Sequence, residues 1–433
     1  MFPLVLSGGK AYSYIKLVSQ WGHKMGGEFS LQHAVILCGA GANAAYEVGV
    51  LKAILQESWG RDRNPPVDPF CFAATSVGAL NAAVMVAQAH RSPREAIDYL
   101  EKLWLNRIAS EGESTVNGIF RIRTDPTQYL DPQVWLKEPL KPLEELSADF
   151  LQIGRRAAQR IGLAVATEGP LLDRAVVGAD FSEFVDISPG IALLGEAVDL
   201  GKILLSPTRL RITAVNWETG KPKTFANDEV GGSEGISIIA GAFCPPGVAQ
   251  PQMVEGYPYV DASLLEQTPL KPAIDARGAD SKTGLVLHII YLDTNLTDIP
   301  VPPLPNTFAT LYRAFLLAFS RSVDADLAKA AATNERIRMR ELLALVASGS
   351  PEALEEAIRT KVGAQAVPFW HELNKDTADK APLTVHRYCP LKHIHGFQFI
   401  QFERKRIEQL IEAGYHDALR HDCEESCCIR RPA

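Results

Sequence analysis

The serine best placed for chemistry is Ser76, in the segment Ala74-Thr75-Ser76-Val77-Gly78. An apolar run at 70–74 precedes it and an alanine-rich stretch at 77–88 follows it, which predicts a buried strand and then a tightly packed helix. A serine on such a turn holds its hydroxyl clear of the sheet, and the amides that open the helix favour negative charge beside it. The segment therefore predicts a nucleophilic serine on an elbow of Gly-x-Ser-x-Gly type, against the alternative of an ordinary strand–helix turn.

A second segment, Gly39-Ala40-Gly41, follows the apolar run 35–38 and leads into a predicted helix at 44–56. Backbone N–H groups at such a strand end can hold an anion, either a nucleotide phosphate or the oxyanion of an acyl transition state. The Gly-Lys-Ser/Thr ending of a phosphate loop is absent, and Ala44 occupies the place of the third glycine of a dinucleotide loop. We therefore expect an oxyanion hole near Gly39, Ala40 and Gly41.

The third candidate is Asp261, which ends the segment Tyr259-Val260-Asp261 and is followed by the small residues Ala262 and Ser263. An aspartate at the end of a strand can reach a serine on a neighbouring turn and accept its proton. A lone carboxylate in this setting can instead serve as a cap or turn residue. Asp261 is thus a candidate base for Ser76.

The elements that must position these residues alternate along the chain. Strands are expected at 35–38, 70–74, 210–215 and 285–292, and helices at 44–56, 77–88, 308–319 and 402–413. This order predicts an α/β fold, with a parallel-rich central sheet covered by helices on both faces. We expect an N-terminal extension at 1–30, one domain at 31–420 with a helical insertion at about 105–200, and a cysteine-rich, disordered tail at 421–433.

Composition narrows the class of protein. The chain has 433 residues and a net charge of −7, which argues against a dedicated nucleic-acid binder. No apolar run reaches the roughly 18 residues of a spanning helix, and the start lacks the charged region of a signal peptide. Seven scattered cysteines fit a reduced setting. We expect a cytoplasmic protein, for which a local surface patch would still allow peripheral contact with a membrane.

Taken in order, the three segments resemble the patatin-like phospholipase family. That family carries a Gly-Gly-Gly-x-Arg-Gly loop, a Gly-x-Ser-x-Gly turn, and Asp-Gly-Gly or Asp-Gly-Ala. Further similar stretches lie at 212–220, 240–246 and 410–418, and the resemblance spans about residues 34–418, with 105–200 the weakest part. It implies a three-layer patatin-like fold and a lipid acyl hydrolase of the phospholipase A or lysophospholipase type, with a lipid as partner and no cofactor.

The resemblance also implies a catalytic dyad without a histidine. Ser76 would attack an ester carbonyl and Asp261 would take its proton. The amides near Gly39, Ala40 and Gly41 would hold the oxyanion, and water would then release the fatty acid from an acyl-enzyme.

The chain departs from the family pattern at several positions. Ala40, Ala44 and Ala74 replace glycines, and Ala262-Ser263 follows the aspartate where Gly-Gly or Gly-Ala is usual, so each adds a Cβ. Asn43 stands where the family has Arg or Lys. Without that charge we expect a shift towards neutral or short acyl esters, the alternative being that Asn43 points to solvent and changes nothing.

Two rival functions stay open. An α/β-hydrolase esterase with a Ser-Asp-His triad would need one of the late histidines, which are His288, His371, His386, His393, His395, His416 and His421. A non-catalytic lipid-binding or scaffold protein on the same fold is supported by the replaced glycines. The sequence does not set the oligomeric state.

A metal centre is not expected. His386, Cys389, His393 and His395 lie close in sequence, but no second cluster completes a ligand set. Cys423, Cys427 and Cys428 are interpreted as idle thiols of the tail, with lipidation or metal binding as the alternatives.

Overall fold

The computed structural model describes ten stretches of the chain. They are residues 31–111, 117–122, 185–247, 249–263, 265–277, 284–291, 307–346, 351–377, 380–390 and 401–429. The expected N-terminal extension at 1–30 lies outside them, as does most of the insertion predicted at 105–200. The described parts of that insertion form short elements, namely η2 (Trp104–Ile108), β3 (Arg121–Ile122), β4 (Val185–Asp186) and α8 (Ser188–Ala197).

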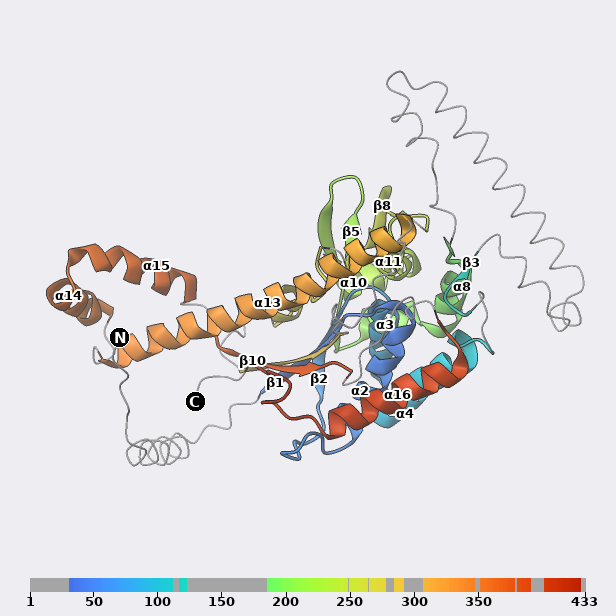
Figure 1. Cartoon of the computed structure of the whole chain (residues 1–433), viewed down its shortest axis with the longest axis horizontal. Coiled ribbons are helices and arrows are strands. Elements are labelled where there is room, and N and C mark those ends of the chain that lie inside the picture. The colour runs from blue at the N-terminus through green and yellow to red at the C-terminus, as the bar shows by residue number, and fades with distance from the viewer. Residues whose placement is uncertain are drawn as a thin grey trace, which may run out of the picture.

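A mostly parallel sheet forms the centre of the molecule (Figure 1). Its strand order is β10-β9-β1-β2-β5-β8-β7, with β6 paired to β5. The parallel strands are β10 (Leu383–Tyr388), β9 (Leu285–Ile290), β1 (Gln32–Leu37), β2 (Pro69–Ala74) and β5 (Arg209–Asn216). The antiparallel ones are β6 (Lys221–Phe225), β7 (Gln252–Val254) and β8 (Tyr257–Asp261). The predicted α/β class with a parallel-rich sheet is confirmed.

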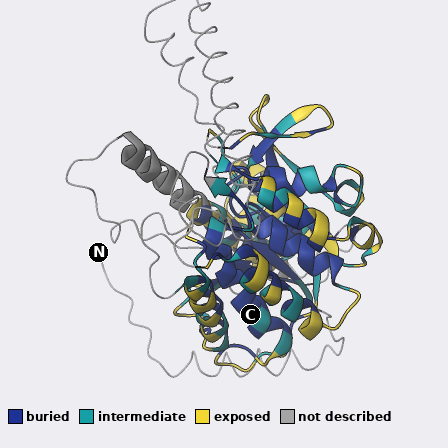
Figure 2. Cartoon of the chain, turned by 90° about the vertical axis from the view of Figure 1, so that its right-hand side faces the viewer, coloured by how far each residue is buried: buried dark blue, intermediate teal, exposed yellow. Residues whose placement is uncertain are grey.

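Helices cover both faces of the sheet, because the central parallel strands β9, β1 and β2 are mostly apolar and cannot face water. One face packs against α2 (Ala45–Gln56), α3 (Gly78–Ala87), α4 (Pro93–Leu103), α11 (Gly235–Ala242) and α16 (Arg404–Leu419). The other packs against α12 (Leu270–Asp275) and α13 (Thr307–Val346). Buried residues fill the middle of the molecule, and exposed ones lie at its periphery (Figure 2).

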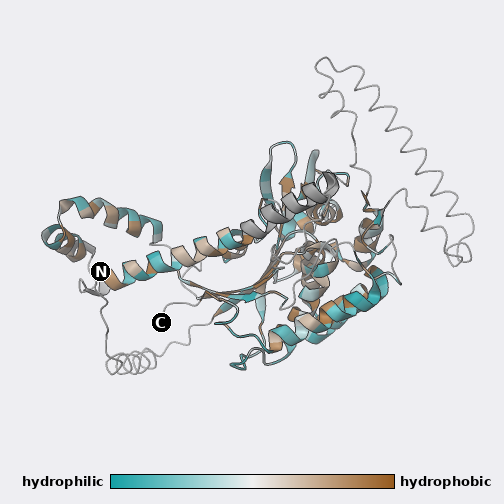
Figure 3. Cartoon of the chain, in the orientation of Figure 1, coloured by the Kyte–Doolittle hydropathy of each residue, from teal (hydrophilic) through white to brown (hydrophobic). Residues whose placement is uncertain are grey.

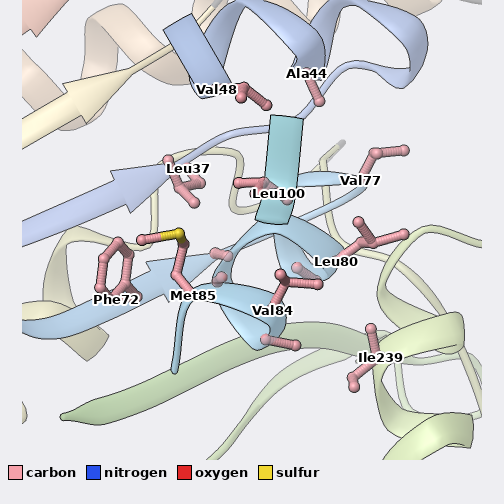
Figure 4. Close-up of a cluster of buried hydrophobic side chains, with 14 of the residues drawn as sticks. Leu37, Ala44, Val48, Phe72, Val77, Leu80, Val84, Met85, Leu100 and Ile239 are labelled. Atoms are coloured by element: carbon pink, nitrogen blue, oxygen red, sulfur yellow. The ribbon is translucent and has the colours of Figure 1, made fainter. Parts of the chain in front are cut away.

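The largest hydrophobic cluster surrounds α3, whose ten residues are all buried. Leu37 of β1, Phe72 of β2 and Leu100 of α4 lie around Leu80 and Val84 in the close-up of this core (Figure 4). The alanines of α3 allow this close packing on the sheet. The helix that begins directly after Ser76 is therefore held rigidly.

The amphipathic helix α16 lies against α2 with the two backbones in contact. A Cβ on Gly49 would lie 1.9 Å from the carbonyl oxygen of Ile411, and one on Gly414 would lie 2.2 Å from that of Tyr46. The hydrophilic residues of α16 are visible along its length in Figure 3, while Ile407, Leu410 and Ile411 are among its buried ones. This contact fixes the position of α16 relative to the loop that precedes α2.

The prediction of a disordered tail is wrong for residues 421–429. This segment forms a turn, and Val385 of β10 exchanges two backbone hydrogen bonds with Ile429, of 2.7 and 3.0 Å. The edge strand β10 offers unpaired backbone groups, and the tail satisfies some of them. No helix among the described residues is both long and apolar enough to cross a membrane.

Candidate active site

Ser76 lies on a sharp turn between β2 and α3. Its φ angle of 51° is in the left-handed region, which a residue with a side chain adopts only when the surroundings hold it there. Thr75 helps to stabilise this conformation of the turn. Its N–H donates to the Leu37 carbonyl at 3.1 Å, and its hydroxyl donates to the Gln267 carbonyl at 2.9 Å. The strained turn presents Ser76 at the carboxyl end of the parallel strands, as expected for an elbow.

Two glycines allow the elbow to touch the loop after β1. A Cβ on Gly39 would lie 2.7 Å from the Cβ of Ser76, and one on Gly78 would lie 2.5 Å from the Leu37 carbonyl oxygen. Neither position can hold a larger residue without a shift of backbone. Ala44 and Ala74, by contrast, have ordinary negative φ angles, so their extra methyl groups strain nothing in the backbone.

Asp261 ends β8, and in the strand order β5 lies between β8 and β2, the strand that leads to Ser76. Burial raises the pKa of Asp261, while its contacts with Ser263 and Ser76 act to lower it, so Ser76 lies close to the carboxylate. The structure thus brings together the two residues that the sequence proposed as nucleophile and base.

Ser263 holds Asp261 in place. The Ser263 N–H donates to Asp261 Oδ1 at 2.8 Å, and the Ser263 hydroxyl donates to the same oxygen at 2.5 Å. Sequence reasoning treated Ser263 only as a departure from the family's glycine or alanine. An aspartate followed two residues later by serine is a common local turn, and that spacing was the signal for this role.

The loop Gly39-Ala40-Gly41 has positive φ angles at all three residues, of 74°, 84° and 62°. We expected all three amides near an oxyanion, but the Gly39 N–H instead donates to Glu47 Oε1 at 2.7 Å. In the part of the chain that the structure describes, no acceptor is bonded to the N–H of Ala40 or Gly41. The N–H groups of Ala40 and Gly41 are therefore available to donate hydrogen bonds to a ligand.

Glu47 is the centre of a buried network that sequence reasoning missed. Asn81 Nδ2 donates to Glu47 Oε2 at 2.7 Å, and the indole N–H of Trp104 donates to Asn81 Oδ1 at 2.7 Å. Because the indole can only donate, it fixes the orientation of the Asn81 amide. Burial raises the pKa of Glu47 to about 8, against the opposing hydrogen bonds from Gly39 and Asn81. An acidic residue on the apolar side of the helix at 44–56 was the sequence signal for this network.

Asn43 does not point to solvent, so that alternative is wrong. Its side chain is 3% exposed, and its Oδ1 accepts a hydrogen bond from Arg406 Nη2 of α16. Arg406 also donates to the Gln401 carbonyl at 3.1 Å, and burial lowers its pKa to about 10, so it stays charged at neutral pH. The positive charge that the loop sequence lacks is therefore supplied from another helix.

The late histidines lie elsewhere. Buried His288 is close to His33 and Tyr388, with ring nitrogen contacts of 3.1 and 3.2 Å, and His416 lies beside Glu412 on α16. Within the described residues, no histidine is hydrogen-bonded to Ser76 or Asp261. His393 and His395 lie outside the described residues.

More than half of the chain is similar to a known protein family. The family model described as patatin-like phospholipase matches residues 35–274, which is more than half of the chain and includes the loop, the elbow and Asp261. No curated protein matches the sequence. Among solved structures, the crystal structure of VipD from Legionella pneumophila aligns at 10% identity and a TM-score of 0.31, covering 89% of this chain and 67% of VipD. The extent of the family match shows that the chain belongs to the patatin-like phospholipases, a family of lipid acyl hydrolases.

Proposed function

We propose that this chain cleaves fatty-acyl esters of lipids, as a phospholipase A or lysophospholipase, through a dyad of Ser76 and Asp261. The observation that carries the proposal is the closeness of Ser76, on its strained turn beside the Gly39 loop, to the buried carboxylate of Asp261, whose pKa it acts to lower. A buried aspartate with a raised pKa is a stronger base than an exposed one, so it is better suited to accept the serine proton.

The reaction follows from these positions. Ser76 Oγ attacks the ester carbonyl while its proton passes to Asp261. The N–H groups of Ala40 and Gly41 stabilise the oxyanion, and the protonated Asp261 returns the proton to the leaving alcohol. Asp261 then takes a proton from water, which attacks the acyl-Ser76, and it gives that proton to Ser76 Oγ as the fatty acid is released. The dyad is regenerated without a third residue.

We further propose that Asn43 and Arg406 together tune the choice of lipid. The sequence suggested a preference for neutral esters because position 43 carries no charge. The half-buried guanidinium of Arg406 restores a positive charge beside that position. A fixed charge in a partly dry site acts more strongly than in bulk water, so it favours lipids with an anionic headgroup.

Product analysis on a panel of phospholipids, lysophospholipids, galactolipids and acylglycerols tests the activity. The wild type should release fatty acid from at least one class, and Ser76→Ala and Asp261→Asn should not. Ser58→Ala, at an exposed position, is the matched control and should keep full activity. Retained hydrolysis in Ser76→Ala would overturn the assignment. Loss of activity in His371→Ala or His416→Ala with the fold intact would instead favour a triad.

A further inference from the structure

Four side chains that can bind a metal converge at the edge of the sheet. They are His386 of β10 and the tail residues His421, Cys423 and Cys428. One ligand atom from each lies within 4.8 Å of all the others. Sequence spacing does not join these four residues, because the whole of α16 separates His386 from the other three.

The separations match those of a tetrahedral zinc centre. Cys423 Sγ lies 3.4 Å from His386 Nδ1 and 3.7 Å from His421 Nε2, and Cys428 Sγ lies 3.4 Å from His421 Nε2. Zinc bonds of about 2.3 Å to sulfur and about 2.0 Å to nitrogen place adjacent sulfur and nitrogen ligands about 3.5 Å apart at the tetrahedral angle. A set of two thiolates and two imidazoles is characteristic of Zn²⁺.

Neighbouring groups orient the ligands. Ser426 Oγ lies 3.3 Å from His421 Nδ1, so the other ring nitrogen, Nε2, faces the cysteines. The backbone N–H of Arg387 donates to Cys428 Sγ at 3.4 Å, and the Cys428 N–H donates to the Cys423 carbonyl at 2.9 Å. In protein metal sites, hydrogen bonds of this kind orient the side chains that bind the metal directly.

The turn that carries the two cysteines is itself well held. Asp422 Oδ1 accepts from the N–H groups of Glu424 and Glu425 at 2.8 and 3.1 Å, and the Asp422 carboxylate pairs with Arg61 at 2.8 Å. Together with the backbone bonds between Ile429 and Val385, these contacts keep the tail against β10.

We propose that His386, His421, Cys423 and Cys428 bind one Zn²⁺ ion, which departs from the sequence expectation of no metal. With four protein ligands the site has no open position, so its role is structural rather than catalytic. Each thiol releases its proton when it binds. The ion ties the chain that leaves α16 to the sheet, and α16 carries the Arg406 that contacts Asn43. The centre therefore supports the candidate active site from a distance.

Metal analysis of the full-length protein, purified without chelator, tests the proposal. Wild type should contain about one zinc per chain, and a Cys423→Ser/Cys428→Ser double variant should contain less than about a tenth of that. Cys427→Ser is the matched control, since Cys427 lies in the same turn but is exposed and outside the cluster, and it should keep its zinc.

A second measurement avoids reliance on a variant that fails to fold. Zinc is removed from the wild type by a chelator under reducing conditions, and Co²⁺ is added. Binding of one Co²⁺ should give the visible absorption of a tetrahedral ion and the ultraviolet band of thiolate ligation, and Zn²⁺ should abolish both. Absence of these bands together with a zinc-free purified protein would overturn the proposal. So would a Cys423–Cys428 disulfide in the purified protein, found by peptide mass mapping without reduction.

Discussion

Replacing Glu47 by glutamine tests whether a buried carboxyl group controls the loop beside Ser76. The two carboxyl oxygens accept from the Gly39 N–H and from Asn81 Nδ2, each at 2.7 Å. Glutamine has nearly the same shape but only one oxygen, so one of these donors must face an NH₂ group. The substitution therefore removes the titrating group and changes the hydrogen bonding while it keeps the packing.

The effect on stability depends on pH. The pKa of Glu47 rises from an ordinary 4.5 to about 8 in the folded chain. A raised pKa means that the folded state binds a proton more tightly than the unfolded state, so the contribution of Glu47 to stability is complete below pH 4.5 and is lost as pH rises to about 8. At about 1.4 kcal/mol per pH unit, the loss between pH 5.5 and 7.5 is about 3 kcal/mol.

Urea denaturation at pH 5.5 and 7.5 measures this loss. Glu47→Gln carries no titrating group at that position, so its stability relative to wild type should improve by about 3 kcal/mol between the two pH values. Glu57→Gln, at an exposed position at the end of the same helix, should show no such change. A stability difference that is the same at both pH values would refute the reasoning.

Activity supplies the second readout for Glu47→Gln. A loop with one hydrogen bond fewer should hold the Ala40 and Gly41 amides less accurately. Since loss of one oxyanion donor costs about a hundredfold or more in kcat, poorer positioning of two should cost about tenfold. An unchanged kcat at pH 7.5 would mean that Glu47 does not position the loop.

Three further substitutions probe the site. Gly39→Ala should abolish ester hydrolysis, because the new Cβ would lie 2.7 Å from the Cβ of Ser76. Gly220 is the control: its φ of 65° is similar but its surroundings are open, so Gly220→Ala should keep activity and lower the stability in thermal or urea unfolding by about 1 kcal/mol. Arg406→Met should lower the ratio of anionic to neutral lipid hydrolysis by about fivefold, which corresponds to about 1 kcal/mol of lost electrostatic attraction. Arg404→Met, on the exposed side of α16, is the control and should leave this ratio unchanged. The acid limb of the kcat/KM profile should lie above the ordinary aspartate pKa of 3.8, because the pKa of Asp261 is raised and protonated Asp261 cannot accept the Ser76 proton. Ser263→Ala should move this acid limb to higher pH, because it removes a hydrogen bond that lowers the pKa of Asp261. An acid limb that Ser263→Ala leaves in place or moves to lower pH would contradict the role of Asp261 as base.

Sequence patterns predicted the strands that are mostly apolar. The runs at 35–38, 70–74 and 285–292 correspond to β1, β2 and β9, which are buried on both faces. Strand β10 was missed because Leu383–Tyr388 mixes apolar residues with threonine, histidine and arginine. That mixture has a physical reason, since an edge strand meets other groups on its outer side, here the tail.

The candidate site was predictable where its chemistry follows from local sequence. The elbow around Ser76 and the strand end at Asp261 each have a recognisable local pattern. Arg406 and the cluster around His386 do not, because their partners come from distant segments. Asn43 shows the consequence most clearly, since its meaning depends on a guanidinium 363 residues away.

Covalent labelling with a fluorophosphonate, followed by peptide mass mapping, tests the central claim most directly. The probe reacts only with a serine whose hydroxyl is activated and whose oxyanion is stabilised. The account predicts one adduct per chain, on Ser76, with labelling abolished in Ser76→Ala and in Asp261→Asn and unchanged in Ser58→Ala. An adduct on another serine, or equal labelling of wild type and Ser76→Ala, would contradict it.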